Sequence, residues 1–301
     1  DDFEVLKVIG KGSFGKVMQV VKKDTNRVYA MKVLKKQQLV KQKEIQHTIS
    51  ERKILAKNTN PFLVGLKYSF QSPEKIYFVL DYINGGELFV HLQREGTFSV
   101  ERARLYAACL ILAMEHLHSC DIVYRDLKPE NILVDINGFV KLCDFGLCKE
   151  NVKEGGRTTT FCGTPEYMAP EILLQKGYGH TVDWWCIGTL IFEMITGLPP
   201  FYDENVQEMY QKILTAPLVF PPKFPSADGE DIITRLLNRE PKERLGVNGS
   251  EEIKSHAFFK KLRWKDLMQL KVKPPWRPNL RDVSPPNAWA CTRLLYYPAF
   301  V

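Results

Sequence analysis

Three features are missing from this sequence: a pair of cysteines separated by two residues, an internal repeat, and a hydrophobic run long enough to cross a membrane. Its seven cysteines are scattered and odd in number, which argues against a disulfide framework and favours reduced thiols. The most apolar run, residues 184–198, contains Glu193 and falls short of the roughly 20 residues that a membrane helix needs. We therefore predict a buried helix there. Because no signal peptide opens the chain, we expect it in the cytoplasm, or also in the nucleus.

The composition is that of a soluble globular protein, with 301 residues, 45% of them hydrophobic and 26% charged. This length allows two modest domains or one bilobal domain. The net charge of +7 is spread along the chain, with denser patches at residues 35–36, 41–43 and 260–273. A solvated surface is the simpler interpretation of these patches, and a nucleic-acid or lipid-headgroup site is the alternative.

The most informative stretch is residues 124–146, YRDLKPENILVDINGFVKLCDFG. Two short apolar runs, separated by the turn signal DING, predict a hairpin that holds the polar residues before and after it in one cleft. Asp126, Lys128, Asn131 and Asp144 supply a base, a cation and two oxygen ligands for a metal, as phosphoryl transfer requires. Any one of these residues alone could be an ordinary turn former.

A glycine-rich segment, GKGSFGKV at residues 10–17, lies within a region that alternates like β-strands from residue 3 to 33. Glycines in this spacing also occur in dinucleotide-binding folds, where a helix follows them. Here strands follow instead, which favours a loop whose backbone N–H groups approach phosphate oxygens. Val17 and Ala30 would then enclose a flat ring such as adenine, although plain strand core explains them equally well.

Lys32 lies in an otherwise apolar strand, where a lone ammonium would be costly to bury. We expect its partner to be Glu51, in a predicted helix over residues 47–55. Thr48, Glu51 and Leu55 share one face of that helix by their spacing. The alternative for Glu51 is a solvated carboxylate.

A third apolar strand, residues 76–80, runs into the turn sequence DYINGGE, where we place the boundary between two lobes. Backbone groups of Asp81 and Ile83 could pair with adenine edges, and Leu80 would line the pocket. Glu87 would begin a helix and reach the ribose or a basic substrate side chain. A long amphipathic helix is predicted over residues 99–118 and carries no evident chemistry.

A polar stretch, residues 150–160, precedes TFCGTPEYMAPE and predicts a loop that phosphorylation could order. A phosphate on Thr160 would add about −1.5 to −2 charges, and Arg125, Lys149 and His47 are the cations expected to hold it. A solvated loop with incidental threonines is the alternative.

Further along, the helical C-terminal half offers other contacts. Asp183 is expected to brace the catalytic loop, Glu171 to pair with Arg244, and the chain from Pro274 to run as an extended tail.

Taken in order, these motifs resemble those of eukaryotic protein kinases, and TFCGTPEY, HTISE and the proline-rich tail resemble the AGC group. Within it the chain is most similar to the serum/glucocorticoid-regulated kinase, Ypk and Akt branch, over residues 1 to about 283. Tyr124 stands where the family usually has histidine. The resemblance implies an α+β bilobal kinase fold. It divides the chain into an N-lobe (1–80), a hinge (81–87), a C-lobe (88–262) and an AGC-type tail (263–301).

The resemblance also implies roles in serine/threonine protein phosphorylation with ATP and Mg²⁺. Asp126 would accept the substrate hydroxyl proton, Lys128 would steady the γ-phosphate, and Lys32 would grip the α- and β-phosphates. Asn131 and Asp144 would hold magnesium. Leu147, directly after DFG, favours serine as acceptor. The expected ATP-binding residues are Ile9, Gly10, Lys11, Gly12, Ser13, Phe14, Gly15, Lys16, Val17, Ala30, Lys32, Leu80, Asp81, Ile83, Glu87, Glu130 and Leu133.

Further expectations concern partners. Glu87, Glu130 and Glu193 match positions that bind arginines upstream of the phosphorylated residue, so substrates of RxRxxS/T type are expected, with Thr164 also in the substrate site. A phosphoinositide-dependent kinase would phosphorylate Thr160. We expect a monomer without nucleic-acid partners or a transmembrane segment, recruited to membranes only through regions outside this chain.

The C-terminal end departs from the AGC pattern. NAWACTRLLYYPAFV replaces the usual acidic segment, turn phosphosite and hydrophobic motif, and only Tyr297 and Phe300 offer a weak substitute. Two rival functions stay open. A catalytically inactive scaffold would normally lack Lys32, Asp126 or Asp144, and a small-molecule kinase would lack the APE segment and the arginine-binding glutamates.

Overall fold

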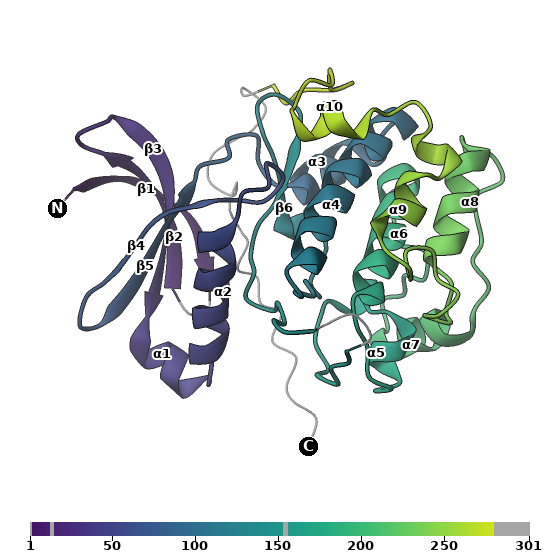
Figure 1. The fold of residues 1–301 in the computed structure, drawn as a ribbon, viewed down its shortest axis with the longest axis horizontal. Coiled ribbons are helices and arrows are strands. Elements are labelled where there is room, and N and C mark those ends of the chain that lie inside the picture. Colours follow the sequence, from purple (N-terminus) through teal and green to yellow (C-terminus); the bar gives the residue numbers. More distant parts are fainter. Residues whose placement is uncertain (1, 13–14, 153–155, 280–301) are drawn as a thin grey trace.

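The computed structural model describes residues 2–12, 15–152 and 156–279, which form two lobes (Figure 1). The N-lobe is a five-stranded antiparallel sheet in the order β1-β2-β3-β5-β4, with two helices beside it. These elements are β1 (Phe3–Gly12), β2 (Gly15–Lys22), β3 (Arg27–Lys35), α1 (Lys36–Lys41), α2 (Ile45–Lys57), β4 (Leu66–Gln71) and β5 (Lys75–Asp81). The predicted strands, the predicted helix around Glu51 and the mixed α+β fold are therefore confirmed.

Two N-lobe elements were not predicted. β4 reads LKYSFQ and none of its residues is buried, while α1 reads KQQLVK and buries only Leu39. Neither has the strong apolar periodicity on which a prediction depends. The register of the sheet matters for function, because Val17 lies opposite Lys32 and Lys32 lies opposite Phe78, deep in the sheet.

The C-lobe is built around two long helices, α4 (Val100–Ser119) and α6 (Thr181–Thr196). Ser99 caps α4 by accepting a hydrogen bond from the Arg102 backbone N–H, as its position before the apolar run predicts. Both helices are buried along most of their length, so the apolar run that includes Glu193 is a core helix, as predicted. No helix among residues 2–12, 15–152 and 156–279 is long and apolar enough to span a membrane.

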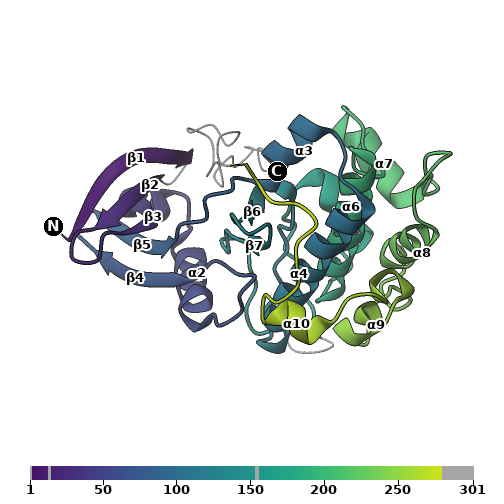
Figure 2. The same ribbon diagram turned by 90° about the horizontal axis from the view of Figure 1, so that it is seen from above.

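Smaller helices surround this pair, as the view from above shows (Figure 2). They are α3 (Leu88–Glu95), α5 (Pro170–Leu173), α7 (Val206–Thr215), α8 (Ala227–Leu236), α9 (Ser250–Lys254) and α10 (Trp264–Met268). The segment after α8 is joined to α5 by an ion pair and to α6 by a hydrogen bond to the Thr181 carbonyl. Arg244 is fully buried and donates two hydrogen bonds to Glu171, at 2.6 and 2.8 Å. The predicted pair between these distant segments is confirmed.

The predicted hairpin is present as β6 (Ile132–Val134) and β7 (Val140–Leu142), next to the boundary between the lobes. The Leu142 backbone N–H donates to the carbonyl of Phe62 at 2.8 Å, and the Val64 N–H donates to the carbonyl of Leu142 at 2.9 Å. These two bonds tie the hairpin to the chain that leads from α2 to β4. The hairpin therefore fixes the segments on either side of it relative to the N-lobe.

The tail follows an extended path along the hinge as far as residue 279, in agreement with the prediction from Pro274 onward. A side chain at Gly138, in the turn of the hairpin at φ +91°, would lie 2.1 Å from the Trp276 carbonyl oxygen, so only glycine allows this approach. The Arg102 guanidinium lies between the rings of Phe98 and Trp276, 3.7 and 3.6 Å from their centroids. Tyr297 and Phe300 lie outside the described residues.

Candidate active site

The loop that precedes β6 is anchored to the first turn of α6. Asp183 is fully buried in the first turn of that helix and accepts hydrogen bonds from the backbone N–H groups of Tyr124, at 3.0 Å, and Arg125, at 2.9 Å. His118, at the end of α4, contacts the same carboxylate through Nε2 at 2.8 Å. Arg125 has a left-handed backbone, with φ +71°, which a side chain disfavours. These bonds explain how the loop keeps that conformation, and the predicted bracing role of Asp183 is confirmed.

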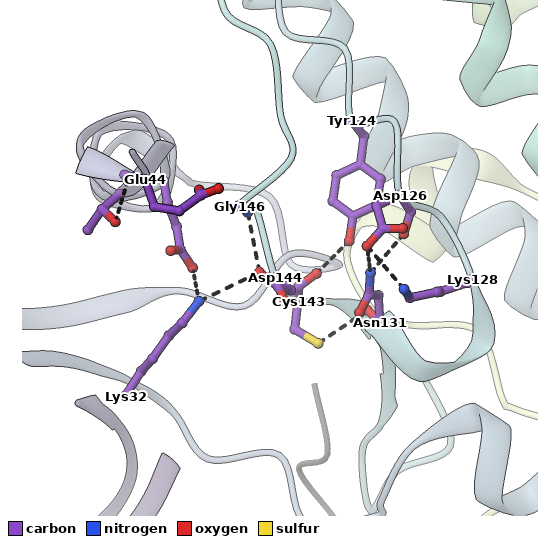
Figure 3. A network of polar contacts seen from close by, with 11 residues as sticks. Lys32, Glu44, Tyr124, Asp126, Lys128, Asn131, Cys143, Asp144 and Gly146 are labelled. Atoms are coloured by element: carbon purple, nitrogen blue, oxygen red, sulfur yellow. Dashed lines mark hydrogen bonds and ion pairs between the residues drawn. The ribbon is translucent and has the colours of Figure 1, made fainter. Parts of the chain in front are cut away.

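Four polar side chains, those of Asp126, Lys128, Asn131 and Thr164, form one hydrogen-bonded group, and Figure 3 shows the first three of them. The Lys128 ammonium donates to the Thr164 hydroxyl at 2.9 Å, and that hydroxyl donates to Asp126 Oδ1 at 3.0 Å. The Asn131 amide nitrogen donates to Asp126 Oδ2 at 2.8 Å, and Lys128 Nζ lies 3.3 Å from the same oxygen. Burial raises the pKa of Asp126, and the Lys128 charge opposes that shift. The contacts with Thr164, Asn131 and Lys128 therefore hold the Asp126 carboxyl group in one orientation.

Lys32 faces this group from the N-lobe. Its ammonium donates to Glu51 Oε1 at 2.6 Å, and Asp144 Oδ1 lies 3.6 Å from it. Glu51 is 4% exposed and the Lys32 side chain is 15% exposed, so the lysine is paired, as the apolar strand predicts, and partly buried. Figure 3 shows Asp144 between Lys32 on one side and the Asp126–Asn131 group on the other. Residues from β3, α2 and the two ends of the hairpin are thus brought together.

Tyr124, at the position where protein kinases usually have histidine, has a structural role. Tyr124 is fully buried, and its hydroxyl donates to the carbonyl of Cys143 at 2.6 Å, directly before Asp144. The Gly146 backbone N–H donates to Asp144 Oδ1 at 3.2 Å, and Asp144 itself has φ +54°. The phenol therefore supports the backbone from which Asp144 extends.

The residues expected around an adenine ring are apolar, buried members of one cluster: Ile9, Val17, Ala30, Leu80, Ile83 and Leu133. At the hinge, the Asp81 N–H already donates to the Gly65 carbonyl at 3.0 Å, and Lys67 lies 3.2 Å from the Asp81 side chain. The Asp81 N–H is therefore already used within the N-lobe. A side chain at Gly15, where β2 begins, would lie 1.8 Å from the Val33 carbonyl oxygen. Ser13 and Phe14 lie outside the described residues.

Comparison with known proteins agrees with this geometry. Residues 3–259 match the model of the protein kinase domain. The chain belongs to the protein kinase family. It is 58% identical over 286 residues to the serine/threonine protein kinase ypkA of Aspergillus fumigatus, which covers 94% of this chain and 45% of ypkA. It is 59% identical over 287 residues to the serine/threonine-protein kinase YPK1 of Saccharomyces cerevisiae, covering 94% and 42%.

A mammalian relative extends the comparison. The serine/threonine-protein kinase Sgk1 of Bos taurus is 54% identical over 285 residues, which cover 94% of this chain and 66% of Sgk1. These relatives are AGC-group serine/threonine kinases, as the motifs indicate. The chain spans less than half the length of the two fungal relatives named above. It is therefore a kinase domain that matches one part of longer proteins.

A group of glutamates lies near Lys128 in this kinase domain. Burial raises the pKa of Glu193 to about 8, and the carboxylates of Glu130 and Glu166 add to the shift. The Tyr167 hydroxyl donates to Glu193. Glu166, within the TPEY string, was not among the predicted substrate residues, although the string itself was noted. Glu87, the third predicted arginine-binding residue, occupies the N-cap position of α3 without a side-chain capping hydrogen bond and is 2% exposed.

The predicted phosphate-binding cations differ in position. Arg125 is 5% exposed and donates to the Leu147 carbonyl at 2.7 Å and to the Tyr178 hydroxyl at 3.3 Å. Tyr178 in turn contacts the backbone of Thr160. His47 instead contacts Glu44, the residue before its own helix, at 2.7 Å, and Lys149 is exposed, with its backbone paired to Val123. The structure thus brings Arg125, but neither of the other two cations, into contact with the surroundings of Thr160.

Three residues of the site escaped prediction from the sequence: His118, Glu166 and Tyr178. Each one acts on a partner far away along the chain, at separations such as 65 residues for His118 and Asp183. His118 lies in an amphipathic helix pattern in which a histidine is more often a packing residue. Tyr178 follows a glycine in a loop and carries no motif signal. Only Glu166 had a signal, because it lies inside a recognised string.

Proposed function

We propose that this domain transfers the γ-phosphate of ATP to serine or threonine hydroxyls in proteins that carry arginines upstream of the target residue. The observation that supports it best is the hydrogen-bonded group of Asp126, Lys128, Asn131 and Thr164, which faces Asp144 and the Lys32–Glu51 pair. Phosphoryl transfer depends on positioning and charge neutralisation, and this arrangement offers both. The activities of the longer proteins to which such a chain belongs are part of the same proposal.

In this mechanism Asp126 orients the substrate hydroxyl and accepts its proton as the oxygen attacks the γ-phosphorus. Lys128 lies 3.3 Å from Asp126, close enough to stabilise charge that develops on the transferred group. Thr164 forms hydrogen bonds with both residues and so fixes their positions relative to each other. Lys32, fixed by Glu51, would bind the α- and β-phosphate oxygens. No covalent intermediate with the protein is involved.

Asn131 and Asp144 fit a magnesium ion. The amide nitrogen of Asn131 is used on Asp126, which leaves its amide oxygen for a cation, and Asp144 provides a carboxylate. No group of three or more His, Cys, Asp or Glu residues is arranged to hold a metal within the described part of the chain. Mg²⁺ usually needs only one or two protein carboxylates, because substrate phosphates and water complete its shell. When bound, it would neutralise phosphate charge.

The preference for arginine is assigned to Glu130, Glu166 and Glu193, which form one acidic group beside Lys128. Burial is the main reason why the pKa of Glu193 is high, and repulsion from the nearby carboxylates of Glu130 and Glu166 adds to the shift. A guanidinium from a substrate would offset that repulsion and form paired hydrogen bonds. Glu87 is kept as a further candidate for a second arginine.

The pKa of Glu193 gives a test that depends on pH. At pH 7 the free enzyme holds Glu193 protonated, because its pKa is about 8, and a bound arginine requires the carboxylate. The KM for a peptide with upstream arginines should therefore fall as pH rises from 6.5 to 7.5, by up to about tenfold, and level off above pH 8. Steady-state kinetics over this pH range measure the effect.

Two controls separate this effect from other titrations. The Glu193→Gln variant should show a KM without this pH dependence, and a peptide with alanines in place of its arginines should show none with the wild-type enzyme. If the alanine peptide gave the same slope, the titrating group would lie elsewhere. If replacing the arginines carried no penalty in KM or kcat, the proposed substrate class would be wrong.

Phosphorylation of Thr160 by an upstream phosphoinositide-dependent kinase is proposed as the activating step. Thr160 is exposed, and Arg125 lies beside its segment. We expect Thr160→Ala to lower kcat at least tenfold relative to the phosphorylated enzyme, because no charge would then order the segment. Thr159→Ala, a change at the exposed neighbour, is the matched control. If Thr160→Ala were fully active, with the modification state confirmed by mass spectrometry, the hypothesis that Thr160 phosphorylation activates the enzyme would be wrong.

A further inference from the structure

The strongest unassigned feature is Tyr178, which lies between α5 and α6 and is 3% exposed. Its backbone forms an antiparallel bridge with Thr158: the Thr158 N–H donates to the Tyr178 carbonyl at 2.8 Å, and the Tyr178 N–H donates to the Thr158 carbonyl at 2.9 Å. Its hydroxyl donates to the Thr160 carbonyl at 2.6 Å. One residue thus holds the segment at two points, 158 and 160.

The same hydroxyl also faces a cation. Arg125 Nη1 donates to it at 3.3 Å, and Cys162 Sγ lies 3.7 Å away. Arg125 is anchored in turn through its Nε to the Leu147 carbonyl at 2.7 Å and through its backbone N–H to Asp183 at 2.9 Å. The phenol therefore lies between the backbone of Thr160 and a guanidinium that belongs to the loop carrying Asp126.

The chemistry of a phenol suits this position. A hydroxyl can donate to a carbonyl and accept from a guanidinium at the same time, provided that it keeps its proton. Burial raises the pKa of Tyr178 well above its usual value, so the proton stays in place throughout the physiological range. A phenylalanine would fill the same volume but could form neither bond. Both hydrogen bonds therefore depend on the hydroxyl group of Tyr178 and not on its aromatic ring.

We propose that Tyr178 is a positioning residue that links the Thr160 segment to the catalytic loop through Arg125. By fixing the Thr160 backbone before phosphorylation, its hydroxyl places the threonine side chain where the added phosphate has a cation close by. The segment then loses less conformational entropy when the phosphate binds to the cation, because two points of the segment are already held. This inference rests on the proposed role of Thr160 and adds the residue that prepares the site for the phosphate.

The test compares Tyr178→Phe with the wild type, each prepared with and without phosphate on Thr160. We expect the ratio of kcat between the phosphorylated and unphosphorylated forms to fall about tenfold, since two hydrogen bonds of ordinary strength are lost. The KM for ATP should not change, because no contact of the nucleotide cleft is altered. Backbone amides 158–162 should exchange faster with solvent in both forms. Tyr202→Phe, at a tyrosine that is 43% exposed, is the matched control and should leave all three quantities unchanged.

Several outcomes decide between this role and simple packing. A kcat ratio that stays at the wild-type value in a folded Tyr178→Phe protein overturns the proposal, whatever its melting temperature. Tyr178→Phe in the Thr160→Ala background should cause little further loss of kcat, and a full additional tenfold loss also overturns it. If Thr160→Ala alone is fully active, the switch in the proposed function fails. Faster exchange of amides 158–162 in Tyr178→Phe would still support the positioning of the segment, and unchanged exchange would overturn that too.

Discussion

Replacing Asp126 by asparagine should lower kcat for peptide phosphorylation by about 10³-fold, while nucleotide binding and stability stay close to those of the wild type. The carboxylate accepts hydrogen bonds from Thr164 and Asn131 and lies 3.3 Å from Lys128. An asparagine oxygen can keep the contacts with Asn131 and Lys128, and its amide can donate to Thr164, whose hydroxyl also accepts. The geometry is therefore conserved, whereas the group that would accept the substrate proton is lost.

The measurement is single-turnover transfer to a basic peptide, together with ATP binding by calorimetry and a parallel ATPase assay. Asp121→Asn, in the loop after α4, is the matched control, because Asp121 is not in contact with the Asp126 group and should leave kcat unchanged. A variant Asp126→Asn with a kcat within tenfold of the wild type would exclude Asp126 as the base. The same assays also separate the rival functions. An inactive scaffold shows no transfer in the wild type, and a small-molecule kinase shows none to peptides.

Loss of one partner of the buried pair between Glu171 and Arg244 should have the largest effect on stability. Removing the carboxylate in Glu171→Ala leaves a fully buried guanidinium with only the Thr181 and Asn238 carbonyls, each at 2.9 Å, as acceptors. An uncompensated buried charge costs about 3–5 kcal/mol in free energy of unfolding. The C-lobe should therefore unfold at a clearly lower denaturant concentration, and activity should be lost in parallel because α5 and α6 support the catalytic loop.

Urea unfolding of the domain, followed by tryptophan fluorescence, measures this free energy. Arg235→Ala provides the contrast, because Arg235 and its partner Asp231 are both about half exposed, at 57% and 48%, and such a pair contributes about 1 kcal/mol or less. The double variant Glu171→Leu, Arg244→Met should recover much of the loss, since both charges are then absent. A loss below about 1 kcal/mol in Glu171→Ala would show that water or a neighbouring group neutralises Arg244.

The parts of the fold that were predictable have strong local signals. The β6–β7 hairpin has two apolar runs around a DING turn, and α4 has Ser99 directly before a long amphipathic pattern. β4 and α1 were missed because their sequences are polar and their conformation depends on the neighbouring strand or helix rather than on their own periodicity. In the site, motif strings predicted the positions of Lys32, Glu51, Asp126, Asn131 and Asp144, and the contacts among them are present.

Patterns within short stretches of chain were enough to identify a kinase domain and to propose its reactive residues. Spacing, turn residues and apolar periodicity depend on a few neighbouring residues, so they can be recognised from the amino-acid sequence alone. Some contacts between distant segments, such as the Lys32–Glu51 and Glu171–Arg244 pairs, could be predicted from motifs. Other features required the folded molecule: the raised pKa of Glu193, the His118 contact with Asp183, and the position of Tyr178 between Arg125 and Thr160. Their strength depends on burial and on distances of about 3 Å. Packing of helices and strands sets both, and no single segment encodes them.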